Sequence, residues 1–285
     1  MNKGLISLAV VALATILLAF GSGAAQAGNV ECGDEIYVDT KLDANIDCLA
    51  YPGMDGVMIS APGITLNLNG FTIIGESIPG ASGVFNVGWD DVTIKNGAIS
   101  GFQDGVRADG VTDLVIKDVM FSDQAFSSIV VVNSADVRIK RVVISQPPGD
   151  GVNVAEAIRL ANVDGAKVKN ATVDGGYFGV LSLGDPNLGD PGTATEIVVR
   201  NSVFTNTTHG IFLVRTTESK IVGNQVHESH GIGIGLVNGS IGNKIKLNTV
   251  TGNDDVDLFH DEGSSPNKWI DNTCGTSGGA DIDCP

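Results

Sequence analysis

The sequence is poor in cationic and aromatic side chains, and it lacks a helical hydrophobic pattern beyond its first 27 residues. It contains 17 Lys and Arg residues against 33 Asp and Glu residues, a formal net charge of −16, and 5% of its residues are aromatic. The negative net charge argues against a nucleic-acid partner, because proteins that bind nucleic acids gain much of their affinity by neutralising phosphates with basic side chains. The missing 3.6-residue periodicity excludes helices as the main elements of the fold.

The long apolar run of this sequence lies at its N-terminus. Lys3 precedes a nearly all-apolar segment from Leu5 to Phe20, and Ala25-Gln26-Ala27 fits the small-x-small cleavage pattern of a secretory signal peptide. A membrane anchor is the alternative, but the run is shorter than the span of about 20 residues that a bilayer requires, and no second run follows. We therefore expect a secreted or periplasmic product without membrane insertion.

Four cysteines lie near the two ends of the remaining chain, at Cys32, Cys48, Cys274 and Cys284. In an exported protein an even number of cysteines favours disulfides over reduced thiols. Three connectivities are possible, and the two local pairings, Cys32 with Cys48 and Cys274 with Cys284, are the natural choice. We expect these disulfides to cap the two ends of the domain.

The strongest pattern is internal repetition. A short segment of small and alternating apolar residues recurs at Val57, Val84, Val106, Ile129, Ile158, Val180, Ile211, Ile232 and Val256. Each copy is followed by a second and a third alternating segment, as in VTIKNGAIS (92–100) and VRIKRVVIS (137–145). Three short strands per repeat leave no room for helices, so stacked repeats pair each strand with its equivalent one coil away. This predicts an all-β fold, a right-handed parallel β-helix of about nine coils.

The repeats also set the expected boundaries and register. We expect a signal peptide (1–27), an N-terminal cap with a local disulfide (28–52), the β-helix (53–274) and a C-terminal cap (275–285). The residues predicted to point inward are Val57, Ile94, Ile116, Ile139, Val168, Val199 and Ile232. Stacked turns are predicted at Asn96, Asp118, Asn170 and Asn201, and one residue later at Asn224, Asn248 and Asn272, with Arg141 as an exception.

With these features the chain resembles the right-handed β-helix repeat proteins of the pectin-lyase-like superfamily. The segment GITLNLNGFTIIG (63–75) is similar to the opening coil of many secreted members, and the resemblance covers about residues 53–274. The superfamily includes pectate lyases, polygalacturonases, alginate epimerases, phage tailspikes and periplasmic copper-maturation proteins. The resemblance therefore implies the fold and a polysaccharide partner, but no specific enzyme family.

One motif resembles a catalytic run of the polygalacturonases. SHGIGIG (229–235) is similar to their histidine-containing segment, which would make His230 a catalytic residue. The neighbouring coils offer Thr207-Thr208-His209 and Gly176-Tyr177-Phe178, without the paired carboxylates that glycoside hydrolysis requires. The alginate epimerase motif Asp-Pro-His-Asp and zinc-ligand spacings are also absent. We therefore expect a protein other than a polygalacturonase.

Two insertions, near Ser145–Glu156 and Gly184–Ala194, flank the first strands and are predicted to wall a groove. The outward residues expected there are Arg107, Arg159, Leu181, Leu183, Phe212, Val214 and, at a strand end, Arg215. Glu156, His209 and His230 are predicted at one equivalent turn position, with the two histidines stacked.

These groove residues suggest a saccharide site. Arg159 or Arg215 would hold a carboxylate beside Phe212, and His230, His209 or Glu156 would act as the acid or base. The alternative is that the loops cover apolar sheet surface and the histidines only cap turns. No cofactor is identified. Asp185, Asn187 and Asp190 in GDPNLGDPG (184–192) could bind calcium, although a plain turn-rich loop explains them as well.

A second surface is basic. Eleven of the 17 basic residues fall at outward positions of the second strands: Lys95, Lys117, Arg138, Lys140, Lys167, Lys169, Arg200, Lys220, Lys244, Lys246 and Lys268. Within this stripe Lys117, Lys140, Lys169 and Arg200 are candidate ligands of an anionic polymer. The alternative is a solvated face that discourages sheet stacking.

Two classes of function remain. The first is a secreted β-helix that binds or processes an acidic polysaccharide, as a lyase, epimerase or hydrolase if it is an enzyme. The second is a non-catalytic structural or surface-interaction solenoid. The sequence leaves catalysis and the oligomeric state open.

Overall fold

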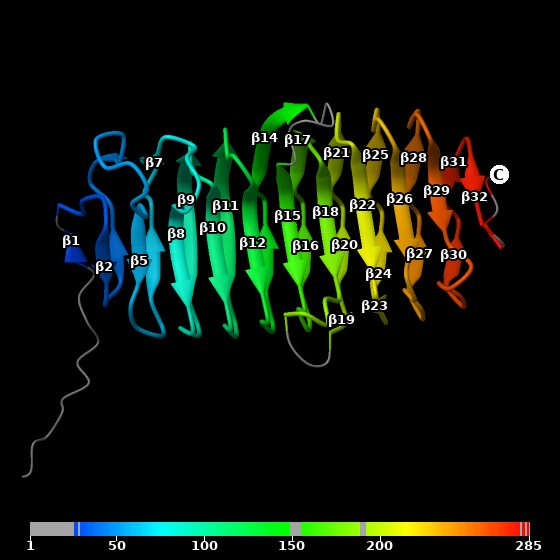
Figure 1. Ribbon diagram of the computed structural model, residues 1–285, viewed down its shortest axis with the longest axis horizontal. Coiled ribbons are helices and arrows are strands. Elements are labelled where there is room, and N and C mark those ends of the chain that lie inside the picture. Colours follow the sequence, from blue (N-terminus) through cyan, green and yellow to red (C-terminus); the bar gives the residue numbers. More distant parts are fainter. Residues whose placement is uncertain are drawn as a thin grey trace, which may run out of the picture.

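The computed structural model describes residues 26–27, 29–148, 155–188, 192–279, 281–282 and 284. All regular elements in these ranges are β-strands, and each named strand pairs with its neighbours in parallel. The strands form a right-handed parallel β-helix of about ten coils, as predicted. Figure 1 shows the coils stacked along the long axis of the molecule, from β2 in blue to β32 in red.

One parallel sheet contains the first strand of each coil. It has 11 strands. Its members are β2 (Asp34–Ile36), β5 (Val57–Ile59), β8 (Ser82–Val87), β10 (Asp104–Asp109), β12 (Ser127–Val132), β15 (Glu156–Ala161), β18 (Phe178–Leu183), β22 (His209–Val214), β26 (Ile232–Val237), β29 (Val256–His260) and β32 (Ser277–Gly278). Strands β2 and β32 extend the sheet beyond the nine predicted copies, one at each end.

The second strands of the coils belong to a 19-stranded sheet. Most second strands are separate elements. In chain order, and including β1 at the N-terminal end, they are β1 (Gln26–Ala27), β3 (Thr40–Lys41), β6 (Thr65–Asn67), β13 (Arg138–Lys140), β16 (Lys167–Lys169), β20 (Val198–Arg200), β24 (Lys220–Val222), β27 (Lys244–Lys246) and β30 (Lys268–Ile270). Two longer strands, β9 (Thr93–Ser100) and β11 (Val115–Ser122), run through the turn and include the third strand as well.

The third strands complete this sheet. They are β4 (Ile46–Asp47), β7 (Thr72–Ile74), β14 (Val143–Pro148), β17 (Thr172–Gly176), β21 (Val203–Thr205), β25 (Gln225–His227), β28 (Thr249–Thr251) and β31 (Thr273–Cys274). A short pair, β19 (Ala194–Thr195) and β23 (Thr216–Thr217), bridges the turn before the second strands. Most of the predicted signal peptide lies outside the described residues, whereas Gln26–Ala27 pairs with β3.

The interior is a continuous apolar column. Six of the seven residues predicted to point inward have no exposed surface: Val57, Ile94, Ile116, Ile139, Val168 and Val199. The prediction for Ile232 is wrong, because Ile211 pairs with Ile234 instead. The period-2 pattern thus fixes which face of most strands is buried, whereas the partner of Ile211 lies two residues further along the chain than predicted.

The turn between the second and third strands has the predicted conformation. Asn96, Asp118, Asn170 and Asn201 all have positive φ values, between 51° and 60°. Arg141, the exception in sequence, also has a φ of 50°, and its guanidinium binds both carboxylate oxygens of Asp118 at 2.6 and 2.7 Å. The positive charge of Arg141 compensates the negative charge of Asp118, and this charge-assisted pair lowers the pKa of the Asp118 carboxyl.

A buried asparagine ladder continues the stack toward the C-terminus. The amide of Asn224 donates to Asn248 at 3.0 Å, and that of Asn248 donates to Asn272 at 2.9 Å. Each of the three side chains also donates to a backbone carbonyl of the preceding coil. The ladder therefore satisfies polar groups that the turn would otherwise bury without partners.

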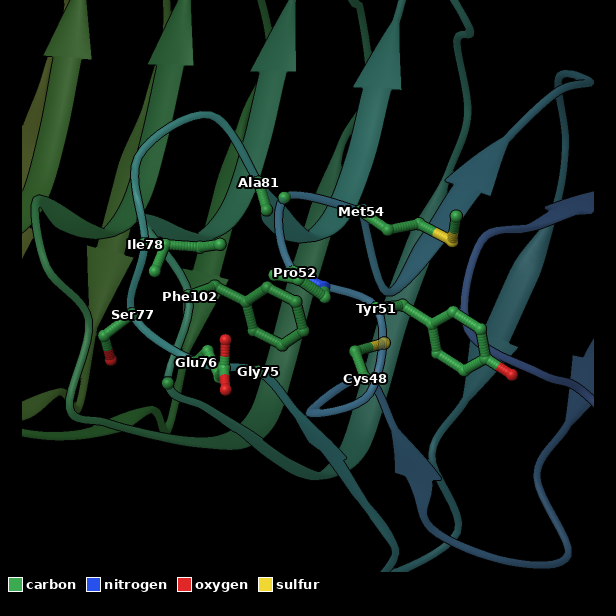
Figure 2. Close-up of a pocket in the computed structure, with 12 residues that line it drawn as sticks. Cys48, Tyr51, Pro52, Met54, Gly75, Glu76, Ser77, Ile78, Ala81 and Phe102 are labelled. Atoms are coloured by element: carbon green, nitrogen blue, oxygen red, sulfur yellow. The ribbon is translucent and has the colours of Figure 1, made fainter.

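Disulfides close both ends, as predicted. Cys32 is bonded to Cys48, and Cys274 is bonded to Cys284. Near the first disulfide, two loops cover the edge of the coil, and Figure 2 shows the ring of Phe102 between Pro52 on one loop and Ile78 on the other. The space left there is only about 10 Å³, which suits a water molecule rather than a saccharide.

Within the described residues, no helix has the length and apolar character that crossing a membrane requires. The two predicted insertions are described only in part, since residues 149–154 and 189–191 lie outside the described ranges. Their flanking segments leave the stack on opposite sides of β15 and β18, near β14 and β19 in Figure 1.

Candidate functional site

The outward surface of β10, β12, β15, β18 and β22 is named the groove face here. One column of side chains along it follows directly from the parallel register. Arg107 pairs with Val130, Val130 with Arg159, Arg159 with Leu181, and Leu181 with Phe212. The column is therefore cationic at one end and apolar at the other. Arg159 and Phe212, predicted as binding residues, lie on it two strands apart.

A second column lies three residues earlier on the same strands. Asp104 pairs with Ser127 and Ser127 with Glu156, while Phe178 pairs with His209. Because Ile158 pairs with Val180, Glu156 and Phe178 are also on equivalent positions. The predicted equivalence of Glu156 and His209 is confirmed, with Phe178 between them.

At the cationic end, each arginine pairs with the carboxylate three residues before it. Arg107 Nη1 lies 3.4 Å from Asp104 Oδ2, and Arg159 Nη1 lies 3.4 Å from Glu156 Oε1. The two pairs sit on either side of Ser127. This end of the groove face therefore carries four charges that cancel, with both carboxylates buried beneath the arginines.

Each buried carboxylate keeps one oxygen without a hydrogen bond. Among the described residues, Asp104 Oδ1 and Glu156 Oε2 have no donor, although the two residues are only 1% and 6% exposed. Burial raises the pKa of both carboxyls, and the nearby charge of Asp104 raises that of Glu156 further. Ser127, which pairs in register with both residues, also has a buried hydroxyl without a hydrogen bond of normal length, and its interaction with Glu156 acts to lower the pKa of that carboxyl. A buried polar atom without a full hydrogen bond costs free energy, so a ligand that supplies a donor gains by binding there.

A pocket of about 250 Å³ opens beside this cluster. Asp104, Arg107, Val130 and Arg159 are among the residues that line it. Leu188, from the second insertion, also lines this pocket, in agreement with the prediction that this insertion borders the groove. The first insertion falls mainly on residues 149–154, outside the described ranges.

At the apolar end, aromatic rings gather around His209. Its ring stacks on Phe178, with centroids 5.2 Å apart and planes at 28°. Phe212 lies 5.1 Å from the His209 ring and 5.4 Å from Phe178, and Tyr177 meets both Phe178 and His209 edge to face. All four side chains are half-buried. Together they present an aromatic surface next to the charged cluster.

The imidazole of His209 has a defined hydrogen-bonding state. Its Nδ1 accepts the backbone N–H of Ile232 at 3.1 Å, so the neutral ring carries its proton on Nε2. Burial lowers the pKa of His209, and the negative charge of Asp255 opposes this only in part. His209 is therefore a neutral hydrogen-bond donor through Nε2, which makes it better suited to binding an oxygen than to accepting a proton.

The glycines of the SHGIGIG segment make room for these rings. A Cβ on Gly231 would lie 2.7 Å from His209 Cε1, and a Cβ on Gly235 would lie 2.4 Å from Phe212 Cε2. Both distances are too short for carbon atoms in contact. The motif that resembles a catalytic run thus has a packing function in this chain: it accommodates the aromatic side chains of the preceding coil.

His230 occupies a different place from the one predicted. Ser229 and Thr207 are hydrogen-bonded 22 residues apart, whereas Ile211 pairs with Ile234, 23 residues away. At neither spacing does His230 align with His209, because a separation of 22 places His230 level with Thr208, and a separation of 23 places His209 level with Ile232. The predicted stacking of the two histidines is wrong. His230 is exposed, and its Nδ1 lies 3.4 Å from Asp254 Oδ2.

Other predicted binding residues lie around the groove face. Arg215 donates to the carbonyl oxygen of Gly184 at 3.3 Å, which ties it to the start of the second insertion. In the candidate calcium segment, Asp185 Oδ1 accepts the backbone and side-chain amides of Asn187 at 2.9 and 3.0 Å, as in an ordinary turn. Asp190 lies outside the described residues.

The basic residues Lys117, Lys140, Lys169 and Arg200 lie on another surface. They follow one another in register on β11, β13, β16 and β20, within the 19-stranded sheet. They do not share the groove with Arg159 and Phe212, and they form a separate candidate surface.

Asp104 is the site residue that reading the sequence missed. Its signal is a repeated pattern: DGVR (104–107) and EAIR (156–159) both place an acid three residues before an arginine at the start of a first strand. Residues three apart lie on opposite faces of a regular strand, yet in both strands the structure brings the acid and the arginine to within 3.4 Å of each other.

Comparison with known proteins places the chain in a family. The family model described as "Periplasmic copper-binding protein (NosD)" matches residues 55–278. The chain belongs to the NosD family. No curated protein matches the sequence. The match covers the predicted β-helix, and membership in this family together with two disulfides supports a periplasmic or extracellular location.

Solved structures confirm the pectin-lyase-like fold of this NosD-family protein. Polygalacturonase from Erwinia carotovora ssp. carotovora is similar over 88% of this chain and 86% of its own, with 9% identity and a TM-score of 0.53. The A-module of mannuronan C-5 epimerase AlgE6 from Azotobacter vinelandii is similar over 87% and 88%, with 13% identity and a TM-score of 0.45. At these identities the likeness concerns the fold alone.

The family description mentions copper, so the fit of this chain to copper can be tested. Proteins bind copper through histidine nitrogens and through cysteine or methionine sulfurs. Among the described residues no group of three or more His, Cys, Asp or Glu side chains is placed to hold a metal ion, and all four cysteines form disulfides. His209 Nδ1 is occupied by a backbone amide, and His230 faces Asp254.

The methionines do not change this result. Met54 and Met58 line one shallow pocket with Asp55 near the N-terminal end. The Oδ1 of Asp55 already accepts the backbone N–H of Ser82 at 2.6 Å. The two methionine sulfurs therefore have no additional described side chain beside them that is committed to binding a metal ion. The described residues therefore do not fit a copper centre.

Proposed function

We propose that this protein binds an acidic polysaccharide along the groove face, in the periplasm or outside the cell. The single observation that carries the proposal is the pair of buried oxygens without hydrogen bonds, Asp104 Oδ1 and Glu156 Oε2, whose arginine partners Arg107 and Arg159 line a pocket together with Asp104. Sugar hydroxyls are the donors that such carboxylates commonly receive, because one hydroxyl fills one lone pair without adding charge. NosD-family membership supports the periplasmic or extracellular location, and the proteins that share the fold include a polygalacturonase.

The arginines supply the complementary half of the recognition. Arg107 and Arg159 each use one Nη1 on a carboxylate, so the remaining N–H groups stay available. A guanidinium can bind a substrate carboxylate through two parallel hydrogen bonds. The site thus offers acceptors for hydroxyls and donors for an acidic substituent within one pocket.

The aromatic end extends the site along the solenoid. Phe178 and Phe212 give the apolar face of a sugar ring a surface to pack on, and His209 offers Nε2–H to a ring or hydroxyl oxygen. From Arg107 to Phe212 the column spans four strand spacings, about 19 Å. That length suits a short run of sugar units lying parallel to the solenoid axis, rather than a single monosaccharide.

Processing of the polymer would use the same groups. Glu156, with its pKa raised by burial, is the candidate that retains a proton for transfer to a departing oxygen. His209 would orient the substrate through Nε2–H. His230, exposed beside Asp254, stays a candidate base only for a polymer that extends past the aromatic end.

Binding and chain shortening can be measured together. The purified protein is titrated calorimetrically with oligosaccharides of pectate, alginate and neutral glycans at 0.5 M salt, and chain length is followed by chromatography. We expect one oligosaccharide class to bind, and Asp104→Asn with Glu156→Gln to weaken binding by roughly tenfold or more, since each change replaces an acceptor by a donor-bearing amide.

Asp136→Asn is the matched control. Asp136 is an exposed turn residue away from the groove face, and its change should leave binding within about twofold. If every glycan class fails to bind the parent protein, or if the groove variant binds as well as the parent, the proposal is wrong and the structural solenoid is favoured.

A further inference from the structure

The 19-stranded sheet carries a second surface with a regular charge pattern. Lys95, Lys117, Lys140, Lys169 and Arg200 are consecutive partners in the parallel register of β9, β11, β13, β16 and β20. Strand spacing puts one positive charge about every 4.8 Å along this column. Five in-register cations therefore form a straight row parallel to the solenoid axis.

A parallel column two residues earlier adds more cations. Arg138 and Lys167 pair on β13 and β16, and Lys220, Lys244 and Lys268 pair on β24, β27 and β30. With Lys246 on β27, the two columns hold all eleven residues of the basic stripe. The remaining outward positions of these columns between β6 and β30 are neutral: Thr65, Asn67, Thr93, Val115, Val198, Val222 and Ile270.

The charges of the stripe are left without counter-charges. Arg138 forms an ion pair with Asp113 at 3.1 Å, and within the described ranges the other ten have no ion pair. The chain has 33 acidic residues, so neutralising partners were available. In-register like charges repel one another. Because these eleven cations repel one another, their arrangement does not stabilise the folded state. We therefore interpret the stripe as a binding surface for an anion outside the protein.

Acidic turns border the stripe on one side. The left-handed turn position that precedes the second strands is occupied by Asp91, Asp113 and Asp136, then by Gly165, and then by Glu196 and Glu218. A broad anionic surface such as a bilayer would meet these carboxylates together with the lysines. A chain of single-polymer width would touch the cations alone.

We propose that the basic stripe binds a linear polyuronate that lies parallel to the solenoid axis. Each sugar of a polyuronate carries one carboxylate, so an extended chain along the solenoid axis offers a linear array of anions to the rows of cations. The two columns hold no aromatic side chain on which nucleic acid bases could stack, which disfavours a single-stranded nucleic acid. The stripe and the groove face lie on different sheets, so this proposal does not rest on the proposed function.

The test is a titration of labelled oligogalacturonate and oligomannuronate of about ten units, at 0.05 M and 0.5 M salt. The stripe variant is Lys117→Gln/Lys140→Gln/Lys169→Gln. We expect the parent to bind one of the two at low salt, with affinity falling at least tenfold at high salt. The stripe variant should lose tenfold or more at low salt and show a smaller salt dependence.

A matched control separates local from overall charge. Gln225→Glu/Thr249→Glu/Thr273→Glu changes the net charge by the same −3 at exposed, in-register positions of the third strands. We expect this control to lose no more than about threefold.

Three outcomes would overturn the proposal. The first is that the parent binds neither oligouronate at low salt. The second is that the stripe and control variants lose equal affinity, because overall charge then suffices. The third is that vesicles containing anionic lipid or a single-stranded oligonucleotide bind the stripe more tightly than the oligouronates. Outward lysines do not contribute to the core, so thermal denaturation should show all variants folded.

Discussion

The groove face and the basic stripe are built on the same coil spacing, yet they treat charge in opposite ways. On the groove face each arginine is paired with an acid on its own strand, and both acids are buried. On the stripe, lysines from successive strands face solvent without partners. Ligand binding at the groove face, where the charges are balanced, should depend on hydrogen bonds. Ligand binding at the stripe, where the charges are unpaired, should depend on long-range electrostatic attraction. Salt should therefore separate the two surfaces.

The largest expected difference is in stability. Arg159→Ala leaves the carboxylate of Glu156 buried and uncompensated, and should lower the free energy of unfolding by about 2 to 4 kcal/mol at neutral pH. Lys140→Ala, on the stripe, removes a repelled charge and should change it by less than about 0.5 kcal/mol. Urea denaturation of both variants measures this contrast. Equal losses in the free energy of unfolding would show that the ion pair between Arg159 and Glu156 does not stabilise the folded state.

A second prediction concerns the glycines under the aromatic surface. Gly235→Ala places a Cβ against Phe212, and should cost about 1 to 3 kcal/mol and displace the ring from the groove face. Phe212→Ala removes the clash, so the double variant should lose less than the sum of the single losses. Additive losses in this double-mutant cycle would mean that Gly235 has some other role.

The pH dependence of stability should differ between the two surfaces. Burial raises the folded pKa of Asp104 and Glu156 above their ordinary values of 3.8 and 4.5. The folded state then holds protons that the unfolded state has released, so these groups favour folding at low pH and lose that contribution as the pH rises through the folded pKa.

Asp104→Asn/Glu156→Gln should therefore flatten the fall in stability above about pH 4.5. Denaturation across a pH series measures it, and Lys117→Gln/Lys169→Gln provides the comparison from the stripe. An unchanged pH slope in the carboxylate variant would show that the two groups titrate alike in the folded and unfolded states.

The smallest effect is expected for His230. It is exposed and paired only with the exposed Asp254, so His230→Ala should change the free energy of unfolding by at most about 0.5 kcal/mol. Glycan binding should stay within about twofold of the parent. A loss of binding or turnover of a hundredfold would return His230 to the site and support its proposed catalytic role.

The fold was predictable because its rules are local. Alternation set the buried face of Val57, Ile94 and Val199, and the asparagine positions marked the turns. The exported context and the spacing of Cys32 and Cys48 made a local disulfide the natural pairing. Repetition multiplies each of these signals, so an error in one coil does not alter the architecture.

The candidate site was less predictable, because it depends on single residues. Ile211 pairs with Ile234 instead of Ile232, and this difference of two residues, which also separates His230 from the position level with His209, leaves no mark in the hydrophobic pattern. Asp104 was overlooked because one acid among 33 carries little weight until its arginine three residues later is matched with the same spacing at Glu156. The contact between Gly231 and the ring of His209 depends on packing between neighbouring coils, and the sequence of a single repeat does not reveal such a contact.

The most direct test of the groove face is hydrogen–deuterium exchange with and without a bound oligosaccharide. It is carried out at 0.5 M salt, where attraction to the stripe is screened. The account predicts slower exchange in residues 104–109, 126–133, 156–161, 178–183 and 209–214, and unchanged exchange in the second strands. Protection confined to the second strands, or spread evenly along the solenoid, would contradict it.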